Sequence, residues 1–188
     1  MDISGSMRKL YKSGVVQNIL ERIYPLATKF DDDGSLDMWI FSHSFNKLSA
    51  VVEENFDTYI EAEILNKKPS SSWGRTEYAP VMEDVISTYK YSKIPAYVIF
   101  ITDGQNSDKT KTKQALIEAS NYPIFWQYVG IGFEEFEFLK RLDELKGRAI
   151  DNANFFQLND IMSVSDEELY NRLLNEFPDW YKEIHKNS

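Results

Sequence analysis

The segment from Ala96 to Thr102 (AYVIFIT) constrains the fold most, because it carries no regular polar alternation. Such an unbroken apolar run is typical of a strand that is covered on both faces, as in parallel sheets. Asp103 follows the strand, and helical spacing resumes from about Thr110 to Asn121, with Asp108 or Ser107 as a candidate N-cap. Strand, loop and helix in this order form the repeating unit of α/β folds.

The same alternation recurs along the chain. Helices are predicted over residues 9–30, 78–89, 110–121, 136–145 and 166–177, and strands over residues 36–41, 96–102, 124–129 and 155–158. An edge strand and a short helix are expected between Ser49 and Lys68, and Ser165 begins a capping box that ends at Glu168. We therefore expect one α/β domain over residues 1–188, with a doubly wound, Rossmann-like, mostly parallel sheet and its ligands at the carboxyl ends of the strands.

Composition excludes several classes of function. The 188 residues contain no cysteine, which rules out disulfides, thiolate metal sites and thiol nucleophiles. The net charge of −9 argues against nucleic-acid binding, which relies on attraction to phosphates. The longest apolar run, Ile94 to Ile101, is too short to span a membrane, and no apolar signal-peptide core follows Met1. A cytoplasmic protein with no membrane partner is expected.

Oxygen donors gather in three of the expected loops. The first is Asp2-Ile3-Ser4-Gly5-Ser6, a D-x-S-x-S motif that places a carboxylate and two hydroxyls at alternate positions before a helix. Thr76 lies in the loop before the second helix, and Asp103 ends the AYVIFIT strand. Hard oxygen ligands of this kind suit Mg²⁺, with Mn²⁺ or Ca²⁺ as alternatives. The predicted metal ligands are Asp2, Ser4, Ser6, Thr76 and Asp103.

This combination resembles the metal-ion-dependent adhesion site of the von Willebrand factor A (vWA) family, which is built from D-x-S-x-S, a distant Thr and a distant Asp. The resemblance is closest to the TerF-type branch, which is linked to tellurium resistance and stress response. The stretches that carry it are residues 30–34 (FDDDG), 39–42 (WIFS), 125–130 (FWQYVG), 151–156 (DNANFF) and 175–180 (NEFPDW). It implies a non-enzymatic, metal-binding interaction module of a bacterial cytoplasmic stress system, acting beside TerD-type proteins.

One departure from the family pattern concerns the first strand. Family members carry a hydrophobic strand directly before D-x-S-x-S, whereas only Met1 precedes Asp2 here. The first central strand is therefore expected to be missing from this chain. Without it, the loop that holds Asp2, Ser4 and Ser6 would lose an anchor, and metal affinity would suffer.

The expected mechanism follows from charge. Asp2 and Asp103 formally balance one divalent cation, and the hydroxyls add only neutral oxygens. If either carboxylate binds through water, the metal stays electrophilic and favours another anion. A Glu or Asp of a protein partner would complete its coordination, which is how adhesion-site domains are understood to recognise ligands.

The same residues allow other interpretations. A magnesium-dependent phosphoryl hydrolase would use Asp2 as nucleophile, but Ser4 stands where haloacid-dehalogenase-type enzymes carry a second Asp. A Ser6-His43-Asp103 hydrolase lacks the G-x-S-x-G elbow. Zinc would need more ligands than the two histidines supply, and the run Asp31–Asp33 lacks the spacing of an EF-hand. A structural module with a vestigial metal site remains a further alternative.

Overall fold

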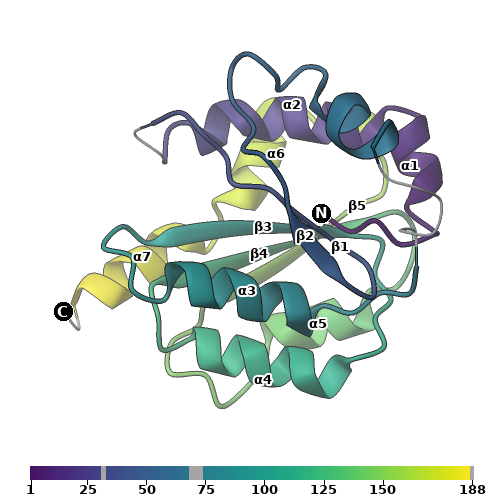
Figure 1. Cartoon of the computed structure of the whole chain (residues 1–188). Coiled ribbons are helices and arrows are strands. Elements are labelled where there is room, and N and C mark those ends of the chain that lie inside the picture. Colours follow the sequence, from purple (N-terminus) through teal and green to yellow (C-terminus); the bar gives the residue numbers. More distant parts are fainter. Residues whose placement is uncertain (31–32, 68–73, 187–188) are drawn as a thin grey trace. The chain divides into compact units, whose positions relative to one another are not determined.

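The computed structural model describes residues 1–30, 33–67 and 74–186 (Figure 1). The chain divides into two compact units, Met1–Thr76 and Glu77–Ser188, and each is described by itself. Among the described residues, no helix is both long enough and apolar enough to cross a membrane.

The first unit combines helices with short strands. Its elements are α1 (Arg8–Lys12), α2 (Val15–Ala27), β1 (Trp39–Phe41), β2 (Phe45–Lys47) and a π-helix (Ile60–Leu65). The strands β1 and β2 pair antiparallel, with Ile40 opposite Asn46. The expected short helix between Ser49 and Lys68 is present as the π-helix, whereas the edge strand, β2, lies just before that region.

The single helix predicted over residues 9–30 is wrong, because two helices occupy this stretch. Gly14 separates them with a φ of 80°, a left-handed conformation that glycine adopts without steric cost. Pro25 lies inside α2, and the amide of Thr28 still donates to the carbonyl of Tyr24. The break at Gly14 makes α1 a short, separate turn directly after the D-x-S-x-S motif.

The residues before this motif pair with β1. The amide of Ile3 donates to the carbonyl of Phe41 at 2.8 Å, and the amide of Phe41 donates to the carbonyl of Met1 at 3.1 Å. Asp2 and Phe41 thereby form one isolated parallel bridge, not a named strand. The beginning of the motif is thus anchored to β1 through main-chain hydrogen bonds.

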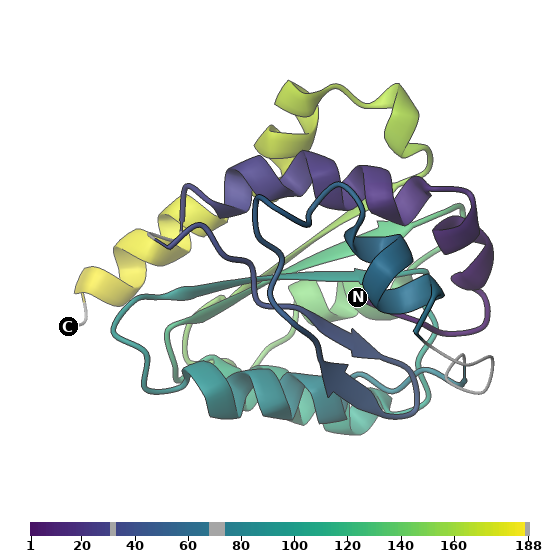
Figure 2. The same ribbon diagram turned by 45° about the horizontal axis from the view of Figure 1, so that its top comes forward.

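The second unit contains a parallel sheet in the order β3-β4-β5, which confirms the predicted fold class. Its strands are β3 (Ala96–Thr102), β4 (Ile124–Ile131) and β5 (Ala153–Leu158), and its helices are α3 (Ala79–Tyr89), α4 (Lys109–Ala119), α5 (Glu137–Asp143), α6 (Asp166–Leu173) and α7 (Phe177–Lys186), with a 3₁₀ turn at Ile161–Ser163. Every residue of β4 is buried. Figures 1 and 2 show α3 and α4 on one face of this sheet and α6 on the other, as in a doubly wound fold.

The C-terminal helix predicted over residues 166–177 is also divided. Helix α6 begins at the predicted Ser165 cap, whose hydroxyl accepts from the amide of Glu168 at 3.2 Å, but it ends at Leu173. Helix α7 starts anew at Phe177 because Pro178 has no amide hydrogen for an uninterrupted helix and suits a first turn. Phe177 and Trp180 then pack on Phe125 of β4, so α7 closes the core of this unit.

Candidate functional site

The D-x-S-x-S motif folds into a compact loop in the first unit. Oδ1 of Asp2 accepts a hydrogen bond from the amide of Ser4 at 2.6 Å, which fixes the turn. The hydroxyl oxygens of Ser4 and Ser6 lie 3.0 Å apart. Asp2 and Ser4 are buried, whereas Ser6 is exposed. The structure thus brings all three predicted ligands of this motif into one loop.

The segment that carries Thr76 contacts the same loop. The amide of Gly5 donates to the carbonyl of Gly74 at 3.4 Å, and Thr76 follows two residues later with 9% of its surface exposed. A main-chain hydrogen bond therefore ties the Thr76 segment to the middle of the D-x-S-x-S motif. Trp73, which flanks this segment in the sequence, lies outside the described residues.

Tyr11 of α1 supports the loop from behind. Its hydroxyl donates to the carbonyl of Asp2 at 2.9 Å, and the side chain is fully buried. Burial, with a smaller contribution from the negative charge of Asp2, raises the pKa of the Tyr11 phenol well above its usual value. Tyr11 therefore stays a neutral hydrogen-bond donor that holds the main chain at Asp2.

Asp103 belongs to the second unit, where it directly follows β3 at the carboxyl end of the parallel sheet. The hydroxyl oxygen of the preceding Thr102 accepts from the amide of Gly104 at 3.1 Å and lies 2.9 Å from the hydroxyl of Tyr78. Asp103 itself is partly exposed. The five predicted ligands are therefore distributed as four in the first unit and one in the second.

By its chemistry alone, the predicted donor set is of a magnesium type rather than a zinc type. Among residues 1–30, 33–67 and 74–186, no three His, Cys, Asp or Glu side chains are grouped as metal ligands. The predicted site needs no such group, because three of its five donors are hydroxyls. The aspartates Asp31 and Asp32, weighed above for calcium, lie outside the described residues.

His43 lies exposed in the loop between β1 and β2. Its Nδ1 is 3.4 Å from the hydroxyl of Ser42, and it would lie 2.4 Å from a Cβ atom placed on Gly74. No local sequence pattern predicts this approach, because residues 43 and 74 are distant in the chain. The hydroxyl of Ser6 pairs with Ser4, so the described hydrogen bonds do not form a Ser6-His43 dyad.

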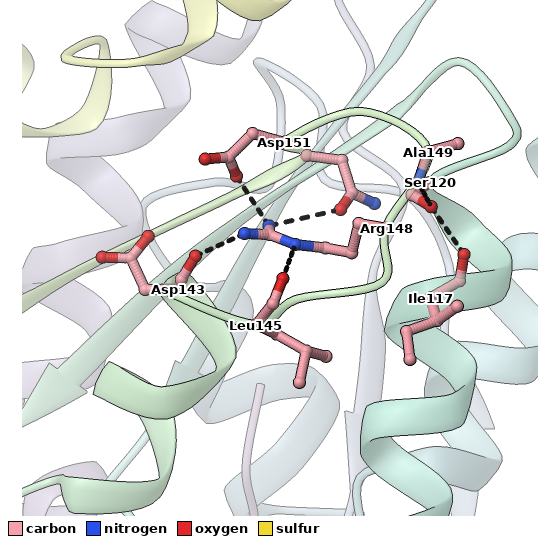
Figure 3. A network of polar contacts seen from close by, with 8 residues as sticks. Ile117, Ser120, Asp143, Leu145, Arg148, Ala149 and Asp151 are labelled. Atoms are coloured by element: carbon pink, nitrogen blue, oxygen red, sulfur yellow. Dashed lines mark hydrogen bonds and ion pairs between the residues drawn. The ribbon is translucent and has the colours of Figure 1, made fainter.

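A second polar cluster surrounds Arg148, in the connection between α5 and β5 (Figure 3). The guanidinium donates to the carbonyls of Leu145 and Asp143 and forms an ion pair of 2.7 Å with Asp151. The side chain of Arg148 is only 6% exposed. Because it binds main-chain carbonyls, we interpret Arg148 as a structural anchor of this connection.

Asp143 makes this cluster sensitive to pH. Burial, followed by the charges of Glu176 and Asp151, raises the pKa of Asp143 to about 7, although Arg148 opposes the change. The unfolded carboxyl has a pKa of about 3.9, so between these values the folded state holds a proton that the unfolded state lacks. The free energy of unfolding should therefore fall as pH rises from about 4 to 7.

The measurement is urea unfolding of the whole chain at pH 5 and pH 8. We expect the stability advantage of Asp143→Asn over the wild type to be larger at pH 8 than at pH 5, by about 1 kcal/mol because partial exposure screens the charge. Glu135→Gln, which changes an exposed carboxylate that does not contribute to the pKa of Asp143, serves as the control. An equal pH dependence in the wild type and Asp143→Asn would contradict the raised pKa.

Comparisons with known proteins place this fold and motif in a family. The family model described as "vWA found in TerF C terminus" matches residues 1–188. The uncharacterized protein YcbR of Bacillus subtilis is 47% identical over 186 residues, which cover 97% of this chain and 76% of that protein. Copine-C of Dictyostelium discoideum is 27% identical over 166 residues, and the match spans 80% of this chain but only 31% of the copine.

A solved structure agrees at the level of the fold. The vWA domain of SpRpn10 superposes with a TM-score of 0.60 at 8% identity, covering 84% of each chain. At this identity the likeness concerns the fold alone, whereas the family model covers both compact units of the chain. The chain therefore belongs to the vWA-TerF-like family of von Willebrand factor A domains.

Proposed function

We propose that this vWA domain is a non-enzymatic interaction module that holds one divalent cation through Asp2, Ser4, Ser6, Thr76 and Asp103. The ion is Mg²⁺ in the first place, with Mn²⁺ or Ca²⁺ as substitutes. The role of the metal is to bind an acidic side chain of a partner protein. The proposal extends to a bacterial stress-response or tellurium-resistance system in the cytoplasm, with TerD-type proteins as candidate partners.

The observation that carries the proposal is the spacing of the two serine hydroxyls. Two neighbouring ligands of an octahedral Mg²⁺ ion lie about 3 Å apart, because each Mg–O bond is about 2.1 Å long. The oxygens of Ser4 and Ser6 are 3.0 Å apart. The loop therefore carries two neutral oxygens, joined by a hydrogen bond, at a spacing that would suit two neighbouring ligands of this ion.

The surroundings of the loop support the same proposal. Octahedral Mg²⁺ tolerates little distortion, so its ligands must be held by a rigid frame. The main chain of the loop is bonded to Phe41 of β1, to Gly74 and to the phenol of Tyr11. Because these contacts already hold the loop in place, metal binding would cost less conformational entropy.

The recognition step follows from the charges of the ligands. Two carboxylates neutralise a divalent ion only when both bind it directly, and the three hydroxyls contribute no charge. A bound metal would offer an open coordination position to an anion. The five proposed ligands would orient that position. A carboxylate of the partner is the hard anionic ligand that such a position favours.

The experiment uses Mn²⁺ as a paramagnetic probe and acetate as a minimal carboxylate. The chain should bind one equivalent of Mn²⁺ and increase the relaxation rate of water protons, and acetate should reduce this increase saturably while chloride at equal ionic strength should not. Absence of Mn²⁺ binding would refute the metal site. Bound Mn²⁺ that does not respond to acetate would refute carboxylate recognition and leave the metal site standing.

The enzymatic alternative has its own test. Oδ1 of Asp2 is bound to the amide of Ser4, which favours a structural or ligand role for this carboxylate over that of a nucleophile. We expect no magnesium-dependent hydrolysis of p-nitrophenyl phosphate by the purified chain. Hydrolysis that disappears in Asp2→Asn would support the phosphoryl hydrolase instead.

A further inference from the structure

Phe136 has an unusual main-chain conformation. Its φ is 49°, and it is the one non-glycine residue with a positive φ in the part of the chain that the structure describes. This left-handed region is unfavourable for a bulky L-residue, and residues held there cluster at functional sites. Phe136 immediately precedes α5, and only 5% of its surface is exposed.

The ring of Phe136 fills a space that two glycines leave open. A Cβ atom placed on Gly104 would lie 2.7 Å from this ring, and one placed on Gly130 would also lie 2.7 Å from it. The ring of Phe155 on β5 packs 5.7 Å away between centroids. Both glycines are therefore required for the position of the ring, and the ring contacts three neighbouring segments of the carboxyl edge.

Gly104 directly follows the predicted metal ligand Asp103. Thr102 directly precedes Asp103. The hydroxyl oxygen of Thr102 accepts a hydrogen bond from the amide of Gly104, and Thr102 lies opposite Gly130 in the pairing of β3 with β4. The main chain at Asp103 is thus held by the Thr102 hydroxyl and packed against the Phe136 ring through Gly104. Replacing the ring with a small side chain would leave a cavity beside this turn.

We propose that Phe136 is a positioning residue for the metal site: its ring, wedged against Gly104 and Gly130, fixes the turn that aims the carboxylate of Asp103. This inference rests on the proposed function, because it assigns a role in binding the same ion. The strained φ of Phe136 is consistent with a side chain whose placement is maintained by its surroundings. Groups that orient metal ligands through hydrogen bonds change metal affinity by roughly 10- to 100-fold when they are replaced, and a packing contact that acts through Gly104 is expected at the lower end of this range.

The test compares Phe136→Ala with Leu139→Ala by calorimetric titration of the whole chain with Mg²⁺. Leu139 lies on α5, is fully buried, and is not among the atoms closest to Gly104 or Gly130, so its loss destabilises the same helix without opening the space beside Asp103. Phe136→Ala is expected to weaken Mg²⁺ binding by about 10-fold or more, whereas Leu139→Ala should keep the wild-type dissociation constant. Titration is performed well below the unfolding temperature of both variants.

A second pair of variants separates positioning from general loss of stability. Gly130→Ala adds a methyl group against the ring and should weaken Mg²⁺ binding. In the double variant Gly130→Ala/Phe136→Ala the ring is gone and the methyl group has room. The double variant should therefore lose less affinity than the sum of the two single effects. Equal Mg²⁺ affinity of Phe136→Ala and the wild type would overturn the inference and leave the proposed function intact. A wild-type chain that binds no Mg²⁺ would overturn the proposed function itself.

Discussion

Asp103→Asn is expected to lower the affinity for Mg²⁺ by about 100-fold or more while leaving the fold intact. The substitution keeps the shape of the side chain but removes one of the two carboxylate charges that are proposed to balance the ion. Opposite unit charges 4 Å apart attract by about 4 kcal/mol at an effective dielectric constant of 20, and a shorter metal–oxygen distance adds to this value. Partial exposure of Asp103 reduces the effect, which is why the expected loss is about two orders of magnitude.

Glu134→Gln provides the control for this prediction. Glu134 is an exposed carboxylate in the loop after β4, so its neutralisation changes the net charge equally. Calorimetric titration should give the wild-type dissociation constant for Glu134→Gln and no measurable Mg²⁺ binding for Asp103→Asn at the same protein concentration. Equal affinities in the two variants would mean that Asp103 does not hold the ion.

Asp108→Ala is expected to destabilise the chain by about 3 kcal/mol without a direct effect on the metal ligands. The carboxylate of Asp108 accepts from the amides of Tyr78 and Ala79, at 3.0 and 2.8 Å, and from the side-chain amide of Asn106 at 2.9 Å. Hydrogen bonds to a charged group contribute about 1.5–3 kcal/mol each, and water replaces part of what is lost. Asp108 thus joins the start of α3 to the loop before α4.

Urea unfolding measures this effect, with two further variants as references. Asp108→Asn keeps one acceptor oxygen and should lose about half as much stability as Asp108→Ala. Asp179→Ala removes an acidic side chain that is 85% exposed and should change the free energy of unfolding by less than about 0.5 kcal/mol. If Asp108→Ala is no less stable than Asp179→Ala, the carboxylate does not hold the two segments together.

Much of the fold was predictable because its signals are local. The apolar strand Ala96–Thr102 has the predicted bounds, and the Ser165 cap forms as its sequence indicates. The predictions failed at helix interruptions, where one residue outweighs a continuous apolar pattern. Gly14 divides the first helix, and Pro178 lies in the first turn of α7, which starts anew at Phe177, although the spacing of apolar residues runs across both breaks.

The candidate site shows the same limit. The three donors Asp2, Ser4 and Ser6 form one loop because they lie within five residues of one another. Asp108, one of the two N-cap candidates, occupies the N-cap position of α4 without a side-chain capping bond there, and its carboxylate instead bonds the amides that begin α3, about 30 residues earlier. The wedge of Phe136 against Gly104 likewise depends on tertiary packing, which a local pattern does not encode.

The most direct test of the metal site is a crystal structure of the chain with Mn²⁺, located by its anomalous scattering. The proposal predicts one strong peak, with the hydroxyl oxygens of Ser4 and Ser6 at roughly 2.0–2.3 Å and with Thr76, Asp2 and Asp103 bound directly or through water. The same peak should be absent from crystals of Asp103→Asn. A well-occupied ion elsewhere on the chain, or no ion at saturating Mn²⁺, would contradict the proposed site.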